Sequence, residues 1–282
     1  MMKIDDRLAI VTGGAGGIGH VISRRLAQKG FYVLIIDCLK NELDICVHEI
    51  ESSGYKVRGI YADISSVISV NNILNQIIGD FTSVDVLVNS AGIQGELGPF
   101  FKSDINEWEK VIRINLLGTV NISRAIIPQM IKQKKGKIIN FSGGGATGLR
   151  PNFSAYAVSK TAVVRFTEIL AKELFSYNIQ VNAVAPGAVN THMLDEVLQA
   201  GEGVIGMEYK DAVRRKKEGG TSPDLVADLV CYLASDQSDW LTGKLISAVW
   251  DPWKEWMNGN TPELSQNMYT LRRVDGRNIV EK

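Results

Sequence analysis

Short apolar runs alternate with longer amphipathic stretches along the chain, and this alternation constrains the fold more than any other feature. Seven such runs occur, at residues 8–12, 31–36, 57–61, 85–89, 136–142, 179–184 and 244–249. They are continuously apolar, as strands buried on both faces are, and each gap except the last contains one helix-length pattern. Repeated strand–helix units predict an α/β fold with three layers, doubly wound around a seven-stranded parallel sheet.

The connection between the sixth and seventh runs is longer than the others. Residues 191–220 contain two short helical patterns separated by glycines, an arrangement that predicts a mobile lid. Nothing else in the composition divides the chain. We therefore expect residues 1–250 to form a single catalytic domain that includes this lid, followed by a tail at 251–282 that packs on the domain or on a neighbouring subunit.

The charge balance narrows the class of partner. Lys and Arg together number 31, as do Asp and Glu, so no net field favours nucleic acid or an anionic membrane, and a small-molecule substrate is expected. The three cysteines and three histidines lack metal-ligand spacing, so we expect no metal. No run approaches the ~20 apolar residues of a membrane span, and the first residues do not resemble a signal peptide, so a cytoplasmic location is predicted.

A glycine-rich loop follows the first apolar run. It reads "GGAGGIG" at residues 13–19 and leads into an amphipathic helix. Without Cβ atoms such a loop lets a pyrophosphate approach the backbone at a helix N-terminus, although a tight structural turn would also use glycine. Asp37 ends the next strand, where a Rossmann unit presents an acid to the adenosine ribose. A carboxylate there binds a free 2′-hydroxyl and repels a 2′-phosphate, which favours NAD over NADP; a solvated acid is the alternative.

Two further strand ends carry polar residues. Asp63 follows the third run and either faces the adenine amino group or caps the next helix. Asn89 and Gly92 follow the fourth run, at the carboxyl edge of the sheet, where ligands bind in folds of this kind.

The segment "YAVSK" places Tyr156 and Lys160 four residues apart, so a helix presents both side chains on one face. A cation about 4 Å from a tyrosine supplies roughly the 4 kcal/mol needed to bring its pKa from ~10 to near 7. Tyr156 would then exchange a proton with a substrate oxygen at neutral pH. An isolated YxxxK is far more often an ordinary helical pair, so the surrounding motifs decide its meaning.

Those motifs are the glycine loop, Asp37, "NSAG", "INLLGT" with Asn115, "YAVSK" and "PGAVNT". In this order and spacing the chain resembles the short-chain dehydrogenase/reductase family from about residue 5 to 249. The resemblance implies a homo-oligomeric oxidoreductase, a tetramer or dimer, that uses NAD(P) to interconvert an alcohol and a carbonyl. It implies Tyr156 as acid/base, Lys160 binding the nicotinamide ribose while lowering the tyrosine pKa, and Asn115 holding a water in the proton relay.

The resemblance also implies which residues surround the cofactor. Asn89, Ala91 and Gly92 would lie along its ribose and ring, and Thr191 would reach the carboxamide. The full expected set is Gly13, Gly17, Ile18, Gly19, Asp37, Asp63, Ile64, Asn89, Ala91, Gly92, Tyr156, Lys160, Pro186, Val189 and Thr191.

The chain departs from the family at one catalytic position. Thirteen residues before the tyrosine, members usually carry a serine that holds the substrate oxygen, and this chain has Gly143. Either the loop shifts so that Ser142 assists Tyr156, which we favour, or Asn115, backbone N–H groups or a water orient the substrate. The glycine run also leaves room for a bulky or polyhydroxylated substrate, with Gly143 and His192 as candidate contacts.

The tail is the other departure, because Trp250, Trp253 and Trp256 follow the last strand with acids among them. Such a group either forms a platform for a sugar or nucleoside, with Trp250 as a substrate contact, or packs the tail against its own core. The sequence as a whole predicts an NAD-dependent oxidoreductase acting on a sugar, polyol or activated sugar. The alternatives are an NAD-binding scaffold or regulatory subunit, and a net-neutral epimerase or dehydratase that reuses its NAD.

Overall fold

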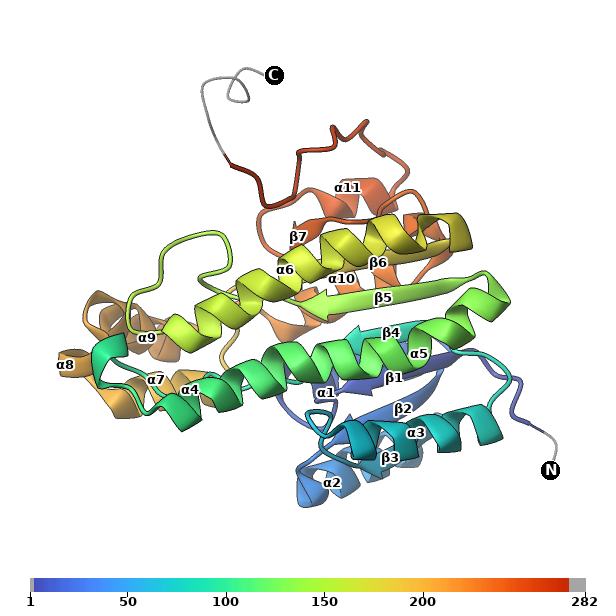
Figure 1. The fold of residues 1–282 in the computed structure, drawn as a ribbon, viewed down its shortest axis with the longest axis horizontal. Helices are drawn as coiled ribbons and strands as arrows, with labels where there is room; N and C mark the ends of the chain where they lie inside the picture. The colour runs from blue at the N-terminus through green and yellow to red at the C-terminus, as the bar shows by residue number, and fades with distance from the viewer. Residues whose placement is uncertain (1–2, 274–282) are drawn as a thin grey trace.

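The structure is a computed structural model that describes residues 3–273. Its centre is a seven-stranded, all-parallel sheet in the order β3-β2-β1-β4-β5-β6-β7, with helices on both faces (Figure 1). This confirms the predicted doubly wound α/β architecture. The strands are β1 (Leu8–Thr12), β2 (Tyr32–Asp37), β3 (Val57–Tyr61), β4 (Val86–Asn89), β5 (Gly136–Phe141), β6 (Ile179–Ala185) and β7 (Leu245–Ser247). The helices are α1 (Gly17–Gln28), α2 (Lys40–Ser52), α3 (Val67–Asp80), α4 (Ile105–Ile112), α5 (Thr119–Gln133), α6 (Ser154–Leu174), α7 (His192–Ala200), α8 (Glu202–Ile205), α9 (Met207–Glu218), α10 (Pro223–Leu233) and α11 (Trp253–Met257).

The sheet is covered on both faces because its strands are apolar on both faces. In β1, Ala9 and Val11 join the cluster that includes α1 and α10, whereas Leu8 and Ile10 join the cluster on the side of α3 and α5. All four side chains are fully buried. Burial of a single Leu, Ile or Val side chain contributes roughly 1.5–3 kcal/mol, so the central strands are fixed strongly in register.

The pairing of β1 determines where a ligand can bind. This strand pairs with β2 on one side and with β4 on the other, so the chain reverses its direction of winding there. In open parallel sheets, ligands bind outside the carboxyl ends of the strands at such a switch point. The glycine loop, Asp37 and Asn89 all come at or just after the carboxyl ends of these strands.

The insertion at 191–220 folds into α7, α8 and α9, one helix more than the sequence pattern indicated. Gly201 and Gly206 have φ values of +79° and +68° and separate the three helices. Glycine adopts this left-handed region without the steric cost that other residues incur. The inner side of the insertion packs Leu194, Val197 and Ile205 into one apolar cluster with Tyr156.

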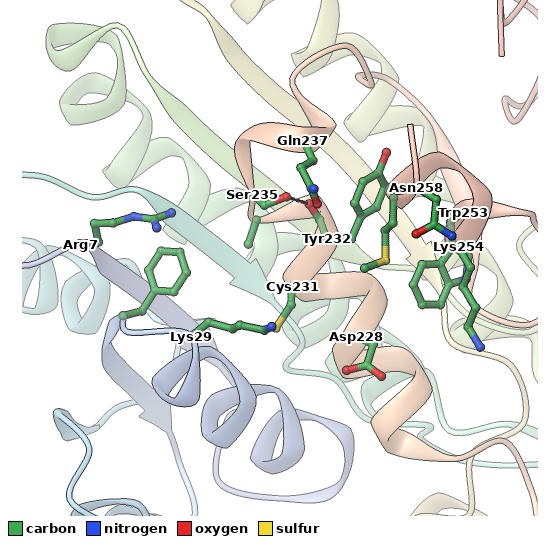
Figure 2. A pocket seen from close by; sticks show the side chains of 13 residues that line it. Arg7, Lys29, Asp228, Cys231, Tyr232, Ser235, Gln237, Trp253, Lys254 and Asn258 are labelled. Carbon is green, nitrogen blue, oxygen red and sulfur yellow. Dashed lines mark hydrogen bonds between the residues drawn. The ribbon is translucent and has the colours of Figure 1, made fainter. Parts of the chain in front are cut away.

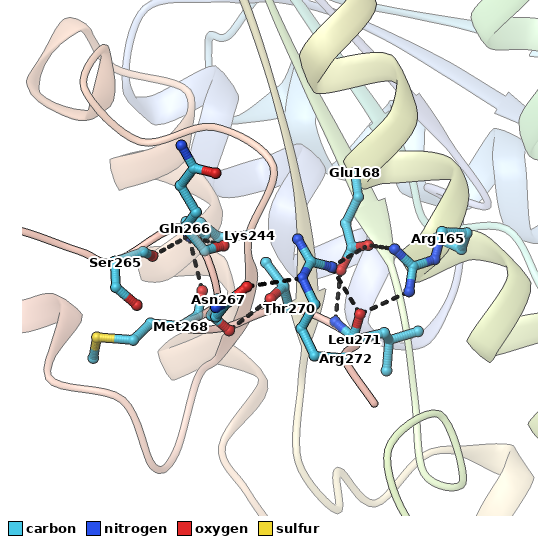
Figure 3. Close-up of polar contacts among 10 residues, drawn as sticks. All are labelled: Arg165, Glu168, Lys244, Ser265, Gln266, Asn267, Met268, Thr270, Leu271 and Arg272. Carbon is cyan, nitrogen blue, oxygen red and sulfur yellow. Dashed lines mark hydrogen bonds and ion pairs between the residues drawn. The ribbon is translucent and has the colours of Figure 1, made fainter. Parts of the chain in front are cut away.

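The described part of the tail, up to residue 273, runs along the outer edge of β7 (Figures 1 and 3). The Leu245 N–H donates to the Tyr269 carbonyl at 2.7 Å, and the Lys244 ammonium donates to three tail carbonyls. Glu168 on α6 accepts from the Leu271 N–H at 2.6 Å and pairs with Arg272 (Figure 3). The tail therefore covers a sheet edge that would otherwise present unpaired backbone groups. Residues 274–282 of the predicted tail lie outside the described residues.

The tail tryptophans do not act as a set. Trp253 and Trp256 are each 2% exposed, and the Trp253 indole donates to the Ala248 carbonyl at 2.9 Å. Trp256 packs edge-on against Trp240 and Tyr269. Of the two alternatives for the tryptophans, packing of the tail against the core therefore holds for Trp253 and Trp256.

A cavity of about 530 Å³ lies at the opposite end of the sheet from the expected site (Figure 2). Its lining includes Arg7 and Lys29, which precede β1 and β2, together with Cys231 and Trp253. It is therefore near the amino ends of the strands. Burial raises the pKa of the Cys231 thiol to about 12, so this group is not a thiolate nucleophile at neutral pH.

Candidate active site

Two glycines of the glycine loop, Gly13 and Gly19, make contacts that leave no space for a side chain. A Cβ atom on Gly13 would lie 2.6 Å from the Ala91 Cα, and one on Gly19 would lie 2.0 Å from the Gly13 carbonyl oxygen. Gly16 caps α1 without any side-chain hydrogen bond, which leaves the N–H groups of the first turn available to an anion. Gly17, Ile18 and Gly19 form this turn. The loop thus fits the pyrophosphate of a dinucleotide.

Asp37 is fixed beside this loop. Its carboxylate is 8% exposed and accepts the Ala15 N–H at 3.0 Å and the Leu39 N–H at 3.1 Å. These bonds use one lone pair on each oxygen, so the carboxylate can still accept from ribose hydroxyls. Its geometry is set by the loop that would hold the phosphates.

Asp63 shapes the turn that follows β3. Its carboxylate accepts both the backbone N–H and the hydroxyl of Ser65, at 2.8 and 2.9 Å. The N-cap of α3 is Ser66, so the capping alternative for Asp63 is wrong, because the helix starts further along the chain. Ile64 is buried against Gly118. The contact of Asp63 with adenine stays a prediction.

Asn89 ties neighbouring elements together beneath the site. It is 2% exposed, and its amide donates to Ser123 at 3.0 Å and to Asn140 at 2.8 Å. Gly92 lies between the groups expected to act on substrate: a Cβ there would be 3.1 Å from Asn115 Oδ1 and 3.2 Å from Lys160 Nζ. A side chain at this position would therefore displace Asn115 or Lys160 by a few tenths of an ångström.

Asn115 occupies a π-helical turn, Arg113–Gly118, that joins α4 to α5. The side chain is fully buried and clamps the backbone of Ile93, donating to its carbonyl at 2.9 Å and accepting from its N–H at 2.8 Å. It also donates to Ser159 at 3.0 Å. Such π-bulges occur mostly at functional sites, and this one aims Asn115 at the loop after β4.

Tyr156 and Lys160 are buried on the inner face of α6. The Lys160 ammonium donates to the Phe141 carbonyl at 3.1 Å and lies 5.7 Å from the centre of the Tyr156 ring. Burial lowers the pKa of Lys160 to about 8. The pKa of Tyr156 is raised by burial and lowered in part by the charge of Arg150. The expected fall of the tyrosine pKa is therefore not present in the protein alone, since desolvation outweighs the nearby cations.

Gly143 is the residue that faces the tyrosine hydroxyl. A Cβ atom at this position would lie 2.3 Å from Tyr156 Oη, so the tyrosine fills the space that a serine would need. The expected widening of the pocket by glycine is therefore not seen. Ser142 is 3% exposed, and its hydroxyl has no hydrogen-bond partner among residues 3–273. Its assistance to Tyr156 stays a prediction.

The remaining predicted residues lie where the lid leaves the sheet. Pro186 follows β6, and Val189 forms a bridge with Thr221. Thr191 begins the lid, and its methyl group is 3.4 Å from a Cβ position on Gly17, so the lid starts beside the glycine loop. His192 is exposed and pairs with Glu196, and Trp250 is 85% exposed beyond β7.

Arg150 is a site residue that sequence reasoning missed. Its guanidinium lies 3.7 Å from the centre of the Phe153 ring and 5.6 Å from that of Tyr156, and it pairs with Glu208 on α9. No periodicity or motif marks an arginine in a loop. The only local signal was its position just before "YAVSK".

Within residues 3–273, no helix is both long and apolar enough to cross a membrane. The same residues contain no group of three or more His, Cys, Asp or Glu side chains placed to hold a metal ion.

The comparisons with known proteins decide the family. The model of the short chain dehydrogenase family matches residues 7–201. The chain belongs to this family. It is therefore a short-chain dehydrogenase/reductase, an oxidoreductase of a family that acts on CH–OH and carbonyl groups with a nicotinamide cofactor. The glycine loop, Asp37 and the Tyr156–Lys160 pair described above fit such a cofactor.

The relatives of this dehydrogenase carry names that refer to different substrates. It is 32% identical to the 3-oxoacyl-(acyl-carrier-protein) reductase FabG of Thermotoga maritima, over 87% of this chain and 97% of that one. It is 35% identical to the short-chain reductase protein NovJ of Streptomyces niveus, over 86% and 92% of the two chains. Among solved structures, NAD⁺-bound xylitol dehydrogenase superposes with a TM-score of 0.79 at 28% identity, covering 87% of this chain and 98% of that one. Actinorhodin polyketide ketoreductase with NADPH superposes equally well, at 29% identity over 87% and 97%.

Proposed function

We propose that the protein is an NAD-preferring alcohol dehydrogenase or carbonyl reductase in which Tyr156 is the acid/base. The observation that carries this proposal is the buried Tyr156–Lys160 pair at the carboxyl edge of the sheet, with Asn115 and the glycine loop beside it. A tyrosine sealed from water in this position exchanges its proton with a bound substrate rather than with solvent.

Different residues of the chain would bind the cofactor and transfer the proton. Bound nicotinamide would supply or accept the hydride. The glycine loop would hold its pyrophosphate, and Asp37 would bind the adenosine ribose. In reduction, the Tyr156 hydroxyl donates a proton to the carbonyl oxygen of the substrate; in oxidation, it removes the proton of the alcohol. The Lys160 ammonium stabilises the tyrosinate that forms, and Asn115 holds the backbone at Ile93 in place.

Preference for NAD over NADP rests on Asp37. Two backbone N–H groups hold this carboxylate in place, where it would repel the 2′-phosphate of NADP and accept the 2′-hydroxyl of NAD. The family itself leaves the choice open, because the similar solved structures include one with NAD⁺ and one with NADPH.

The apolar lid residues favour a less polar substrate than the sequence predicted. Around Tyr156 the lid contributes Leu194, Val197 and Ile205, which favour an apolar group on the side of the substrate that faces the lid. A sugar or polyol is the second candidate, and the likeness to xylitol dehydrogenase and the exposed Trp250 favour it. Both candidates need the same proton transfer at Tyr156.

Assembly and location follow from the family rather than from a contact seen in the chain. We propose a homo-oligomer, a tetramer or a dimer, in the cytoplasm. Sedimentation at several protein concentrations would measure the oligomer.

Nicotinamide absorbance tests the proposed function. The protein is assayed in both directions with NADH, NADPH and their oxidised forms, on ketones, polyols and acyl thioesters, beside Tyr156→Phe. We expect turnover with NADH preferred, a loss of about 10³-fold or more in kcat for the variant, and unchanged NADH binding. Equal turnover by Tyr156→Phe would refute the proposed role. Substrate conversion without net change in absorbance, with cofactor retained through purification, would instead indicate a net-neutral epimerase or dehydratase.

A further inference from the structure

Arg150 has hydrogen-bonding capacity that the structure leaves unused. Within residues 3–273 its hydrogen bonds all run to Glu208, from Nε and Nη2. A guanidinium has five N–H groups, so one edge of the group, including both N–H groups of Nη1, remains available. Nη1 lies 3.5 Å from the Cβ position of Gly144, which is the neighbour of the residue that touches Tyr156 Oη.

The guanidinium is also immobilised. Arg150 is 17% exposed and stacks on the Phe153 ring, and Glu208 fixes its Nε edge. A planar group held by stacking and by a two-point ion pair loses little further entropy when it binds a ligand. Its free edge is therefore preorganised next to Gly144, with the guanidinium 5.6 Å from the centre of the Tyr156 ring.

A second arginine, Arg215, lies on α9, the helix that also carries Glu208. The guanidinium of Arg215 is half-buried on α9, and no hydrogen bond or ion pair within residues 3–273 engages it. Burial lowers the pKa of Arg215, the Glu208 carboxylate opposes this change, and the charge of Arg150 adds to it.

The local charges do not cancel. The Glu208 carboxylate pairs with Arg150, and the next charges along α9, Asp211 and Arg214, pair with each other at 2.9 Å. The charge of Arg215 therefore has no ion-pair partner within residues 3–273, and it is partly desolvated. Such a charge is costly to bury unless it meets an anion during the functional cycle.

We propose that Arg150, supported by Arg215, binds a carboxylate of the substrate, so that the enzyme acts on oxo acids or hydroxy acids. This inference rests on the proposed function. The arginine pair would orient the substrate in place of the serine side chain that position 143 lacks, since a carboxylate and a guanidinium edge form two parallel hydrogen bonds. The apolar lid residues would then contact the remaining carbon chain.

The test compares acids with neutral esters of the same shape. Reduction by NADH is measured for 2-, 3- and 4-oxopentanoate and for their methyl esters. The variants are Arg150→Gln, Arg215→Gln and, as the matched control, Arg214→Gln, whose side chain is 63% exposed. We expect at least one acid to exceed its ester by about tenfold or more in kcat/KM, the range of a charge-assisted hydrogen bond. Arg150→Gln should remove this preference mainly through KM, Arg215→Gln should reduce it, and Arg214→Gln should preserve it.

The outcomes separate the two proposals. Tyr156-dependent turnover of the esters with no preference for the acids would refute the carboxylate site and leave the proposed function standing. If no compound is turned over, calorimetry of the NADH-bound protein decides the inference with pentanoate, methyl pentanoate and inorganic phosphate. Binding of pentanoate alone, lost in Arg150→Gln, would support the site. Equal binding of the ester, binding of phosphate alone, or no binding would overturn it.

Discussion

The two halves of the ligand edge are built in different ways. On the side of β1 and β2, the backbone sets the geometry: Gly19 lies against the Gly13 carbonyl, and Asp37 accepts N–H groups from the loop itself. On the side of β5 and α6, side chains from distant segments set it, since Tyr156 is surrounded by residues of the lid. A short run of sequence encodes the first arrangement, whereas the second exists only after the chain has folded.

The largest expected effect tests whether backbone contacts set the geometry on the side of β1 and β2. This conclusion would fail if the glycine loop tolerated a methyl group. In Gly19→Ala the added Cβ would lie 2.0 Å from the Gly13 carbonyl oxygen, so the loop must open. We expect the Kd for NADH to rise by about 100-fold, equivalent to roughly 2.7 kcal/mol, as measured by fluorescence titration. Gly16→Ala is the control, because no atom lies within 4 Å of its Cβ position. Equal affinities of the two variants for NADH would show that backbone contact does not set the geometry on the side of β1 and β2.

A serine introduced at position 143 tests the side of β5 and α6, where packed side chains set the geometry. In Gly143→Ser the new Cβ would be 2.3 Å from Tyr156 Oη, so the tyrosine must shift out of its apolar cluster. We expect kcat/KM to fall by about tenfold, because small misplacements of a reacting group are costly. Gly148→Ser, with open space around its Cβ position, should behave like the unchanged protein. A gain of activity in Gly143→Ser would mean that packing here is looser than the structure indicates.

A further expected effect concerns stability rather than binding or turnover. The pKa of Lys160 is about 8 in the folded protein and 10.5 ordinarily. Below pH 8 both states carry the charge, and the folded state bears the cost of burying it. Between pH 8 and 10.5 the unfolded chain binds the extra proton, so the free energy of unfolding rises with pH across this window.

Lys160→Met should therefore be more stable than the unchanged protein at pH 7, by about 2 kcal/mol after loss of the bond to the Phe141 carbonyl. This advantage should shrink toward pH 10.5. Thermal unfolding at pH 7 and 10 measures both quantities, with Lys132→Met on the exposed side of α5 as the control. A variant that is less stable at pH 7 would show that the buried ammonium is fully compensated in the folded state.

The sequence predicted the parallel sheet, the glycine loop, and the Tyr156–Lys160 pair on one face of a helix. These features follow from short-range rules: continuous apolar runs for buried strands, glycine where backbones touch, and a four-residue spacing for one helical face. The family comparison then confirmed the motif order that the same residues indicated.

Other features needed the folded chain. The sequence left open whether the tail tryptophans form a binding platform or pack against the core, and in the fold Trp253 and Trp256 face the core. The tail is held there because it covers β7, an edge strand. The raised pKa of Tyr156 results from burial by the lid, which no local pattern records.

The sequence by itself determined the class of fold and predicted Tyr156 as the acid/base. The tertiary structure alone decided what surrounds it: Arg150 meets Glu208 across 58 residues of chain, and Gly143 brings the backbone against the tyrosine hydroxyl. The physical reason is the distance along the chain over which each interaction acts. Hydrophobic periodicity and backbone sterics act within a few residues, whereas desolvation and charge pairing depend on every segment that packs around the site.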